Sequence, residues 1–335
     1  MMINPTIKIV TDRITKRSEA TRSLYLNKMN DARKEGPKRA HLSCGNQAHA
    51  YAPVPEDQKR LIDGAGGNIG IINAYNDMLS AHQPFEKYPD IIKKAARLAG
   101  GTAQVAAGVP AMCDGITQGQ TGMELSLFSR DAIAMSAAIG LSHNVFDTTV
   151  YLGVCDKIVP GMIISAATFG HLPAVFLPAG PMTTGQSNDE KAKIRQDFAE
   201  GKANRSDLMA SEMASYHGPG TCTFYGTANT NQMLMEFMGL HLPGSSFVNP
   251  NTPLRDALTD FGAKHALSIS DLSSNYIPVS KILDEKAYVN GIVGLMATGG
   301  STNLLIHLIA MARASGIIID WSDFAEISKV IPLLA

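Results

Sequence analysis

Apolar runs recur along the chain, and each ends in a Gly-rich or polar turn before a helical pattern begins. They lie within residues 67–77, 101–123, 145–162, 172–185 and 291–317. Short apolar runs of this kind are typical of buried strands. Strands that alternate with helices indicate an α/β fold with a mostly parallel sheet flanked by helices. The ligand site of such a sheet lies beyond the carboxyl ends of the strands, where the polar clusters of this chain fall.

The first part of the chain has a different pattern. Residues 11–39 are polar and predict a solvated surface helix that ends at Gly36-Pro37. We therefore predict an N-terminal helical segment, residues 1–65, that packs on an α/β domain formed by residues 66–335.

Further helices are predicted near residues 124–141 and 162–169, and the last helix should end with Gly316 near its C-cap. A charged helical insertion fills residues 186–206. A run of charged residues usually forms a solvent-exposed helix face, but the basic side chains of this insertion could also bind an anionic substrate group. These side chains are Lys191, Lys193, Arg195, Lys202 and Arg205.

Composition narrows the class of protein. The 335 residues carry a net charge of −1, which argues against a general binder of nucleic acid or of membrane surfaces. The sequence contains no apolar run of about 18 residues, as a membrane span requires, and no signal-peptide pattern at its start, so we expect a cytoplasmic protein. Charged residues are only 18% of the chain, which indicates burial in a thick core or against a partner such as a second copy.

The four cysteines are Cys44, Cys113, Cys155 and Cys222. No CxxC spacing is present, and a disulfide framework is not expected in a long chain without a signal peptide. Two of the cysteines precede an aspartate at a predicted strand end. Thiolates favour iron–sulfur clusters, zinc or copper(I), whereas carboxylates favour magnesium. From the residues alone, a thiolate metal site and four buried core cysteines both remain open.

Two more polar turns fall at the same edge of the predicted sheet. Cys222 lies in a Gly-Pro-Gly turn, and residues 299–303 open a helix whose free N–H groups could hold an anion. Ser301, Thr302 and Asn303 either form a simple N-cap or bind a substrate carboxylate or phosphate.

Several strings resemble the dihydroxyacid and 6-phosphogluconate dehydratase (ILVD/EDD) family. Two signatures carry the resemblance: DGIxxGxxGM, matched by Asp114 to Met123, and CDKxxPGM, matched by Cys155 to Met162. "GPGTCTFYGTANTN" and "ATGGSTN" follow in the family's order, and the likeness extends over essentially the whole chain. "LSCGNQAHAYA", "QGQTGMELSLFSR" and "GTCTFYGTANTNQ" look like the 6-phosphogluconate dehydratase branch.

The resemblance implies dehydration of 6-phospho-D-gluconate to 2-dehydro-3-deoxy-6-phospho-D-gluconate in the Entner–Doudoroff pathway. It implies an iron–sulfur cluster, usually described as 4Fe–4S, held by Cys155 and Cys222. The dihydroxyacid branch takes a further ligand where this chain has Ala81. That departure leaves Cys113 as the candidate third ligand and Cys44 as the alternative.

By the same resemblance, Asp156 and Lys157 are catalytic and face the substrate. Residues matching Asp114, Asp156 and Lys157 surround Mg²⁺ in related sugar-acid dehydratases, where the lysine is carbamylated. An open iron site would act as a Lewis acid on the 3-hydroxyl while a base removes the C2 proton.

The family continues beyond residue 335 into a swivelling, β-barrel-like domain that supplies the proposed base, so we expect this chain to correspond to the N-terminal domain. Two alternatives stay open at this point. One is a dihydroxyacid or sugar-acid dehydratase of the same family, and the other is a catalytically silent α/β domain.

Overall fold

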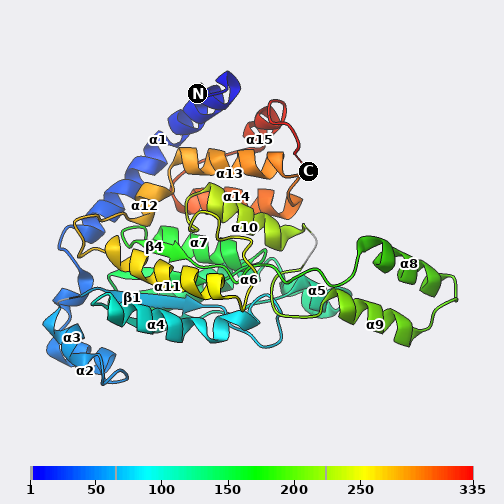
Figure 1. Ribbon diagram of the computed structural model, residues 1–335. Helices are drawn as coiled ribbons and strands as arrows, with labels where there is room; N and C mark the ends of the chain where they lie inside the picture. The colour runs from blue at the N-terminus through cyan, green and yellow to red at the C-terminus, as the bar shows by residue number, and fades with distance from the viewer. Residues whose placement is uncertain (1–2, 65, 223–224, 335) are drawn as a thin grey trace.

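The computed structural model describes residues 3–64, 66–222 and 225–334. Four parallel strands form one sheet in the order β2-β1-β3-β4, with helices on both faces (Figure 1). The strands are β1 (Asn68–Asn73), β2 (Thr102–Gly108), β3 (Thr148–Leu152) and β4 (Ala174–Phe176). The predicted α/β class with a parallel sheet is confirmed.

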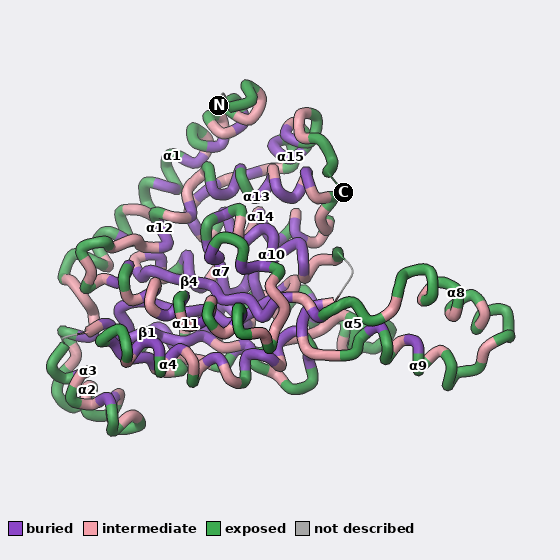
Figure 2. The backbone as a smooth tube through the Cα atoms, in the orientation of Figure 1, coloured by how far each residue is buried: buried purple, intermediate pink, exposed green. Residues whose placement is uncertain are grey.

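Alternate side chains of each strand enter two separate cores, as the pleat requires. Val150 and Leu152 pack under α4 (Tyr88–Leu98) and α11 (Pro253–Ser268). Tyr151 points to the other face, where α6 (Ser129–Leu141) and α7 (Ile158–Thr168) cover the sheet. Figure 2 shows the buried, purple backbone concentrated at this centre. Because both faces are covered, the central strands β1 and β3 are buried almost throughout, whereas the edge strand β2 is only partly buried.

A further layer of helices lies over α7. It contains α10 (Thr227–Phe237), α13 (Glu285–Ala297) and α14 (Thr302–Ala314). The short helix α12 (Val279–Ile282) directly precedes α13. The fifth predicted strand was wrong, because residues 291–297 lie in α13. A Cβ atom at Gly291 would be 2.7 Å from Leu234, and one at Gly294 would be 2.6 Å from Met233. These glycines let α10 approach α13, and a fully buried helix gives the same apolar run as a strand.

Three predicted helix boundaries can be compared with the structure. The helix expected near 124–141 is a 3₁₀ turn, η3 (Thr121–Leu125), followed by α6. The helix expected near 162–169 begins earlier, as α7 at Ile158. The C-terminal end of α14 agrees with the prediction, since Gly316 follows it with a φ of 72°.

The N-terminal segment is helical, but its first helix is not a solvated surface helix. The helix α1 (Pro5–Arg33) buries Val10 and Ile14 in the same core as α7 and α14. It ends shortly before Gly36, as predicted. The segment also contains η1 (Lys38–His41), α2 (Cys44–Tyr51) and α3 (Gln58–Asp63). Residue 65, at the predicted domain boundary, lies outside the described residues, and the boundary stays a prediction.

Ion pairs attach α1 to the last helix, α15 (Trp321–Ser328). Arg17 pairs with Asp320 and with the buried Asp323. Arg13 reaches Glu326 at 2.7 Å. The two helices lie together at one end of the molecule (Figure 1).

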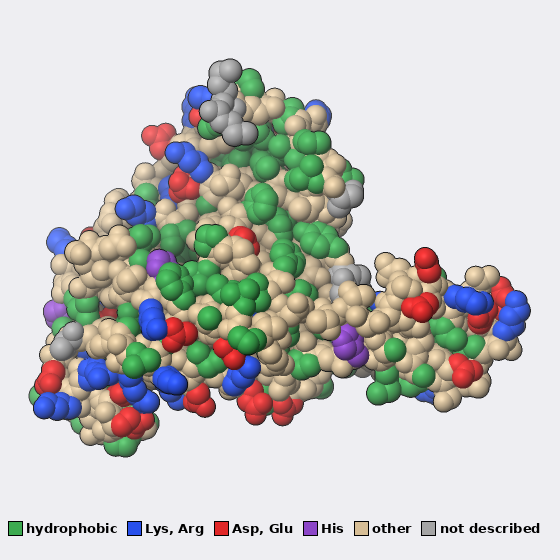
Figure 3. All heavy atoms as spheres, viewed as in Figure 1, with side chains coloured by type: hydrophobic (Ala, Val, Ile, Leu, Met, Phe, Trp, Pro, Cys, Tyr) green, Lys and Arg blue, Asp and Glu red, His purple; other side chains and the backbone are tan. Residues whose placement is uncertain are grey.

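The charged insertion is a helical hairpin that projects from the body, formed by α8 (Asn188–Ala199) and α9 (Arg205–Ser215) (Figure 1). No residue of α8 is buried. Its charges pair within the hairpin: Lys193 binds Asp197 at 3.1 Å and Arg195 binds Glu212 at 2.8 Å. Figure 3 shows both signs of charge interspersed at its tip. This arrangement supports the solvated-face interpretation.

No helix among the residues that the structure describes combines the length and apolar character that crossing a bilayer would need.

A buried ion pair joins the N-terminal segment to the amino-end side of the sheet. The Arg39 guanidinium donates from Nε to Asp147 Oδ2 at 2.6 Å, and it also donates to the carbonyl oxygens of Leu61 and Gly66. The same Asp147 oxygen accepts from the Asn68 N–H at 2.7 Å. Asp147 is fully buried, so its charge depends on Arg39.

We predict that Arg39→Ala lowers the free energy of unfolding by about 3–5 kcal/mol, because it leaves a buried carboxylate without its partner. Urea unfolding followed by circular dichroism measures the change. The control is Arg195→Ala, an exposed pair that should cost no more than about 1 kcal/mol. Equal losses in the two variants would contradict the assignment.

Candidate active site

Three polar turns meet at the carboxyl edge of the sheet. Cys113 and Asp114 follow β2, where α5 (Asp114–Thr117) begins. Cys155, Asp156 and Lys157 follow β3 directly and lead into α7. Cys222 is next to Thr221, which forms a parallel bridge with Pro181 beyond β4. Parallel strands all end at the same edge, so turns that are remote in sequence become neighbours there.

Three of the four cysteines lie within electrostatic reach of one another. Burial raises the pKa of Cys155 well above its ordinary value, and the neighbouring charges of Asp156, Cys113 and Cys222 raise it further. Burial and Cys113 also raise the pKa of Cys222. Cys44 is exposed at the start of α2, on the opposite side of the molecule from α5 (Figure 1). The structure therefore groups Cys113 with Cys155 and Cys222, and separates Cys44 from them.

The donor set fits a cluster better than a single ion. No group of three or more His, Cys, Asp or Glu side chains within the described residues is arranged to hold one metal ion. The thiolates that hold an iron–sulfur cluster bind different iron atoms, so they need not converge on one point. Three free thiols from separate turns that influence one another electrostatically are consistent with that arrangement.

Beside the thiols, a buried ammonium group bridges two carboxylates. The Lys157 side chain is only 3% exposed, and Nζ donates to Asp114 Oδ2 and, at 2.5 Å, to Asp156 Oδ2. Ser126 Oγ donates to the other Asp114 oxygen at 2.6 Å. The Asn303 amide donates to Asp156 Oδ2 at 3.1 Å. Residues from four separate segments thus share one hydrogen-bonded network.

The network shifts the pKa of each member. Burial lowers the pKa of Lys157, but its hydrogen bonds to the two aspartates outweigh burial, so the pKa is raised overall. Burial raises the pKa of Asp114, but hydrogen bonds from Lys157 and Ser126 bring it below its usual range. Asp156 is more deeply buried, and burial keeps its pKa raised despite Lys157. The ammonium is therefore held charged, and Asp156 is the carboxyl group more easily protonated.

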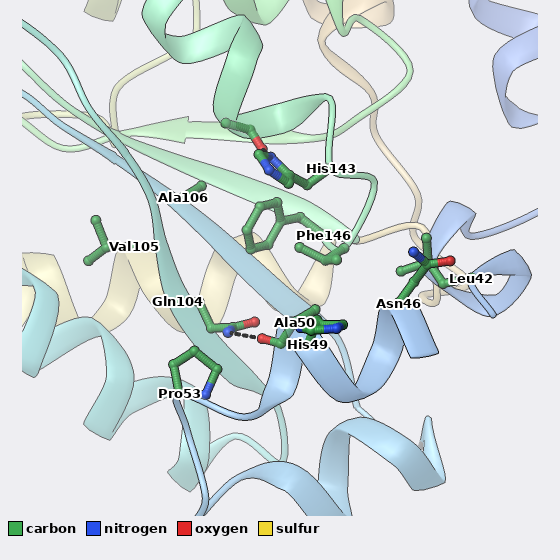
Figure 4. A pocket seen from close by; sticks show the side chains of 12 residues that line it. Leu42, Asn46, His49, Ala50, Pro53, Gln104, Val105, Ala106, His143 and Phe146 are labelled. Atoms are coloured by element: carbon green, nitrogen blue, oxygen red, sulfur yellow. Dashed lines mark hydrogen bonds between the residues drawn. The ribbon is translucent and has the colours of Figure 1, made fainter. Parts of the chain in front are cut away.

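An open cavity of about 400 Å³ gives access to this network. Asp114, Lys157 and Asn303 line it, together with Met123, Glu124, Ser126 and Leu127. A larger cavity of about 600 Å³ lies beside the edge strand β2 and contains none of the predicted site residues (Figure 4). Its Gln104 amide is already bonded to the Ala50 carbonyl oxygen at 3.0 Å. The smaller cavity is the candidate active site.

The predicted substrate-binding turn reaches this cavity through one residue. Asn303 lines it, as described. Ser301 is the N-cap of α14: its hydroxyl accepts from the Asn303 N–H at 3.2 Å and bonds Thr227 Oγ1 at 2.6 Å. Thr302 is exposed at the helix start. A substrate-binding role for Ser301 and Thr302 stays a prediction.

Sequence reasoning missed one residue of the site, Ser126, and one buried titratable group under its electrostatic influence, His307. Ser126 lies within the family string but has no spacing that marks it as a partner of Asp114. His307 is fully buried one turn after Asn303, and burial, Arg130 and Lys157 lower its pKa to about 4. An isolated histidine in an apolar helix gives no signal of its own, since most are core residues.

The Dihydroxy-acid/6-phosphogluconate dehydratase N-terminal family matches residues 67–335. The chain belongs to this family. It is 62% identical to a phosphogluconate dehydratase of Rhizobium meliloti, over all of this chain and 55% of that protein. It is 59% identical to the phosphogluconate dehydratase of Escherichia coli K12, over 99% of this chain and 55% of that protein.

A dihydroxy-acid dehydratase of Acetivibrio thermocellus is more distant, at 34% identity over 91% of this chain and 54% of that protein. The chain spans about half the length of the curated relatives that it matches.

We predict that Lys157→Met makes the protein gain stability as the pH falls. Without the ammonium, Asp114 and Asp156 repel each other, so the lowered pKa of Asp114 rises above that of the unfolded chain and the raised pKa of Asp156 rises further. The folded state then binds protons more tightly, so stability increases as pH falls. As the pH is lowered from about 7.5 to about 5, the free energy of unfolding of Lys157→Met should rise by about 1–3 kcal/mol relative to that of the unsubstituted protein.

Urea midpoints measured across this pH range test the prediction. Lys193→Met, which removes an exposed lysine paired with Asp197, is the control and should show no such trend. A flat difference between Lys157→Met and the unsubstituted protein would mean that the two carboxylates do not interact.

Proposed function

We propose that the protein dehydrates 6-phospho-D-gluconate to 2-dehydro-3-deoxy-6-phospho-D-gluconate, as a hydro-lyase of the Entner–Doudoroff pathway. The observation that carries the proposal is the juxtaposition of three thiols with the Asp114–Lys157–Asp156 network at one edge of the sheet. Relatives named phosphogluconate dehydratase, at 53–62% identity over nearly the whole chain, support the choice of substrate.

We assign the iron–sulfur cluster to Cys113, Cys155 and Cys222. Cys113 replaces the ligand that the dihydroxyacid branch has where this chain carries Ala81. The proximity of Cys113 to both other thiols supports it over the distant Cys44. When bound, the cluster supplies an open iron site as a Lewis acid for the leaving hydroxyl group.

The chain's own residues bind and orient the substrate. The Lys157 ammonium can donate to a substrate oxygen in the cavity while the two aspartates keep it charged. Asn303 fixes Asp156, whose raised pKa suits it to hold a proton near the reacting carbons. If Lys157 is carbamylated, the cation becomes an anionic oxygen donor, and Asp114, Asp156 and Lys157 could then hold Mg²⁺. The base that removes the C2 proton lies, in this proposal, in the part of the relatives that this chain does not match.

We also propose that the protein acts in the cytoplasm as a homodimer. A reducing compartment keeps cysteines available as thiols. Low charge content and exposed apolar side chains on α6, such as Met135 and Ile139, support contact with a second copy.

We predict that Cys113→Ser, Cys155→Ser and Cys222→Ser each remove most of the bound iron and the visible absorbance of the full-length protein. Dehydration should fall by more than the roughly 10–100-fold loss that an outer-shell change causes. Anaerobic iron and sulfide analysis with a turnover assay measures both effects. Cys44→Ser is the control and should behave like the unsubstituted protein. If Cys113→Ser keeps its full iron content, the third cluster ligand is a residue other than Cys113.

We predict that phosphate recognition resides in the turn at residues 301–303 rather than in the α8–α9 hairpin. Thr302→Val should raise the KM for 6-phosphogluconate about tenfold, the loss expected for a hydrogen bond to a charged group. Replacing Lys191, Lys193 and Arg195 together by Ala should leave this KM unchanged, because the hairpin projects from the body and Lys193 and Arg195 are paired there.

Gluconate and a dihydroxy acid, which lack the phosphate, serve as comparison substrates in the same assay. Preference for either would favour the sugar-acid or dihydroxyacid alternative, and no turnover of any substrate would favour a silent domain.

A further inference from the structure

The segment from residue 79 to residue 82, between β1 and η2 (Gln83–Glu86), connects the turns that carry Cys155 and Cys222. The Gly220 N–H donates to the Ser80 carbonyl oxygen at 2.8 Å. The His82 Nε2 atom lies 3.0 Å from the carbonyl oxygen of Val154. Gly220 is two residues before Cys222, and Val154 directly precedes Cys155. One short segment therefore contacts both turns.

The His82 ring is built into the interior rather than placed at the surface. It is 1% exposed and packs against the Phe85 ring with 5.9 Å between centroids. Its Nδ1 atom has no hydrogen-bond partner among the residues that the structure describes. The Val154 N–H also lies near Nε2, at the longer distance of 3.4 Å. We assign the single N–H of the neutral ring to Nε2, because the Val154 carbonyl oxygen is closer and can accept it. The ring's one donor is thus used on the peptide group next to Cys155.

That peptide group decides the conformation of Cys155. Cys155 has a φ of 76°, in the left-handed region that residues with a Cβ atom rarely adopt. Such a conformation persists only where the surroundings hold it. The φ angle of Cys155 describes the orientation of the Val154–Cys155 peptide, and His82 anchors the carbonyl group of this peptide.

We propose that His82 is a positioning residue: it holds the Cys155 turn in its left-handed conformation and, with the Ser80 carbonyl group, fixes that turn relative to the Cys222 turn. The inference rests on the proposed function for its significance, because a cluster needs thiols at a set separation. The contacts themselves do not depend on any bound group.

The test measures how readily Cys155 reacts in metal-free, full-length protein. His82→Leu removes the donor, and His82→Gln places an amide N–H at similar reach. We expect His82→Leu to speed alkylation of Cys155 by iodoacetamide about tenfold, as local opening of the turn would, and His82→Gln to stay within about threefold of the unsubstituted protein. Peptide mass spectrometry gives the rate for each cysteine, and the exposed Cys44 should not change.

His241→Leu is the matched control. His241 is also buried, but its Nδ1 atom bonds Ser246 Oγ at 2.9 Å, away from the cysteine turns. His82→Asn, which is too short to reach Val154, replaces the leucine variant if that variant does not fold. The proposal is overturned if Cys155 reacts at the unsubstituted rate in His82→Leu or His82→Asn, if His241→Leu accelerates it equally, or if glutamine fails to restore protection. Because the measurement needs no cluster, its failure is distinguishable from failure of the cysteine-to-serine test of the proposed function.

Discussion

The ammonium group of Lys157 is withdrawn from water, and a buried charge costs several kcal/mol unless it is paired and hydrogen-bonded. Asp114 and Asp156 supply that pairing, and they belong to the turns after β2 and β3. The pairing therefore attaches two strand ends to each other as well as neutralising a charge. Asn303 extends the same network to α14, so the position of the cavity wall depends on this one lysine.

The two edges of the sheet have different roles. Towards the amino ends of the strands, Arg39 and Asp147 form a closed pair in which backbone carbonyl groups take the remaining donors. This buried pair attaches the N-terminal segment to the sheet, and the second Asp147 carboxylate oxygen has no hydrogen-bond partner among the described residues. Towards the carboxyl ends, Asp114 and Lys157 line a cavity, and Cys155 is held in a left-handed conformation. Perturbed pKa values occur at both edges, since burial also raises the pKa of Asp147. The clustering of thiols, carboxylates and Lys157 is what marks the carboxyl edge as the place where chemistry is expected.

Pattern reasoning worked for strands that are short, apolar and bounded by Gly or Pro. All four strands of the sheet fall within predicted apolar runs. The run of β-branched residues before Cys155, which forms β3, is the clearest of these runs. It failed for residues 291–297, where Gly291 and Gly294 serve the packing of two helices rather than a turn. It also failed for α1, because widely spaced apolar residues such as Val10 and Ile14 are enough to bury a long helix whose other faces are charged.

The sequence by itself determined the α/β class, the family motifs, and the location of the reactive residues at strand ends, because these properties depend on residue order and on the rule that parallel strands end together. Only the tertiary structure decided which cysteines meet. Cys113, Cys155 and Cys222 are far apart in the chain, and only the sheet order brings their turns together, while Cys44 goes to the other side. Packing likewise decides that Ser126, Asn303 and His82 bond to the turns of the site. A hydrogen bond between distant segments leaves no periodic pattern in the sequence.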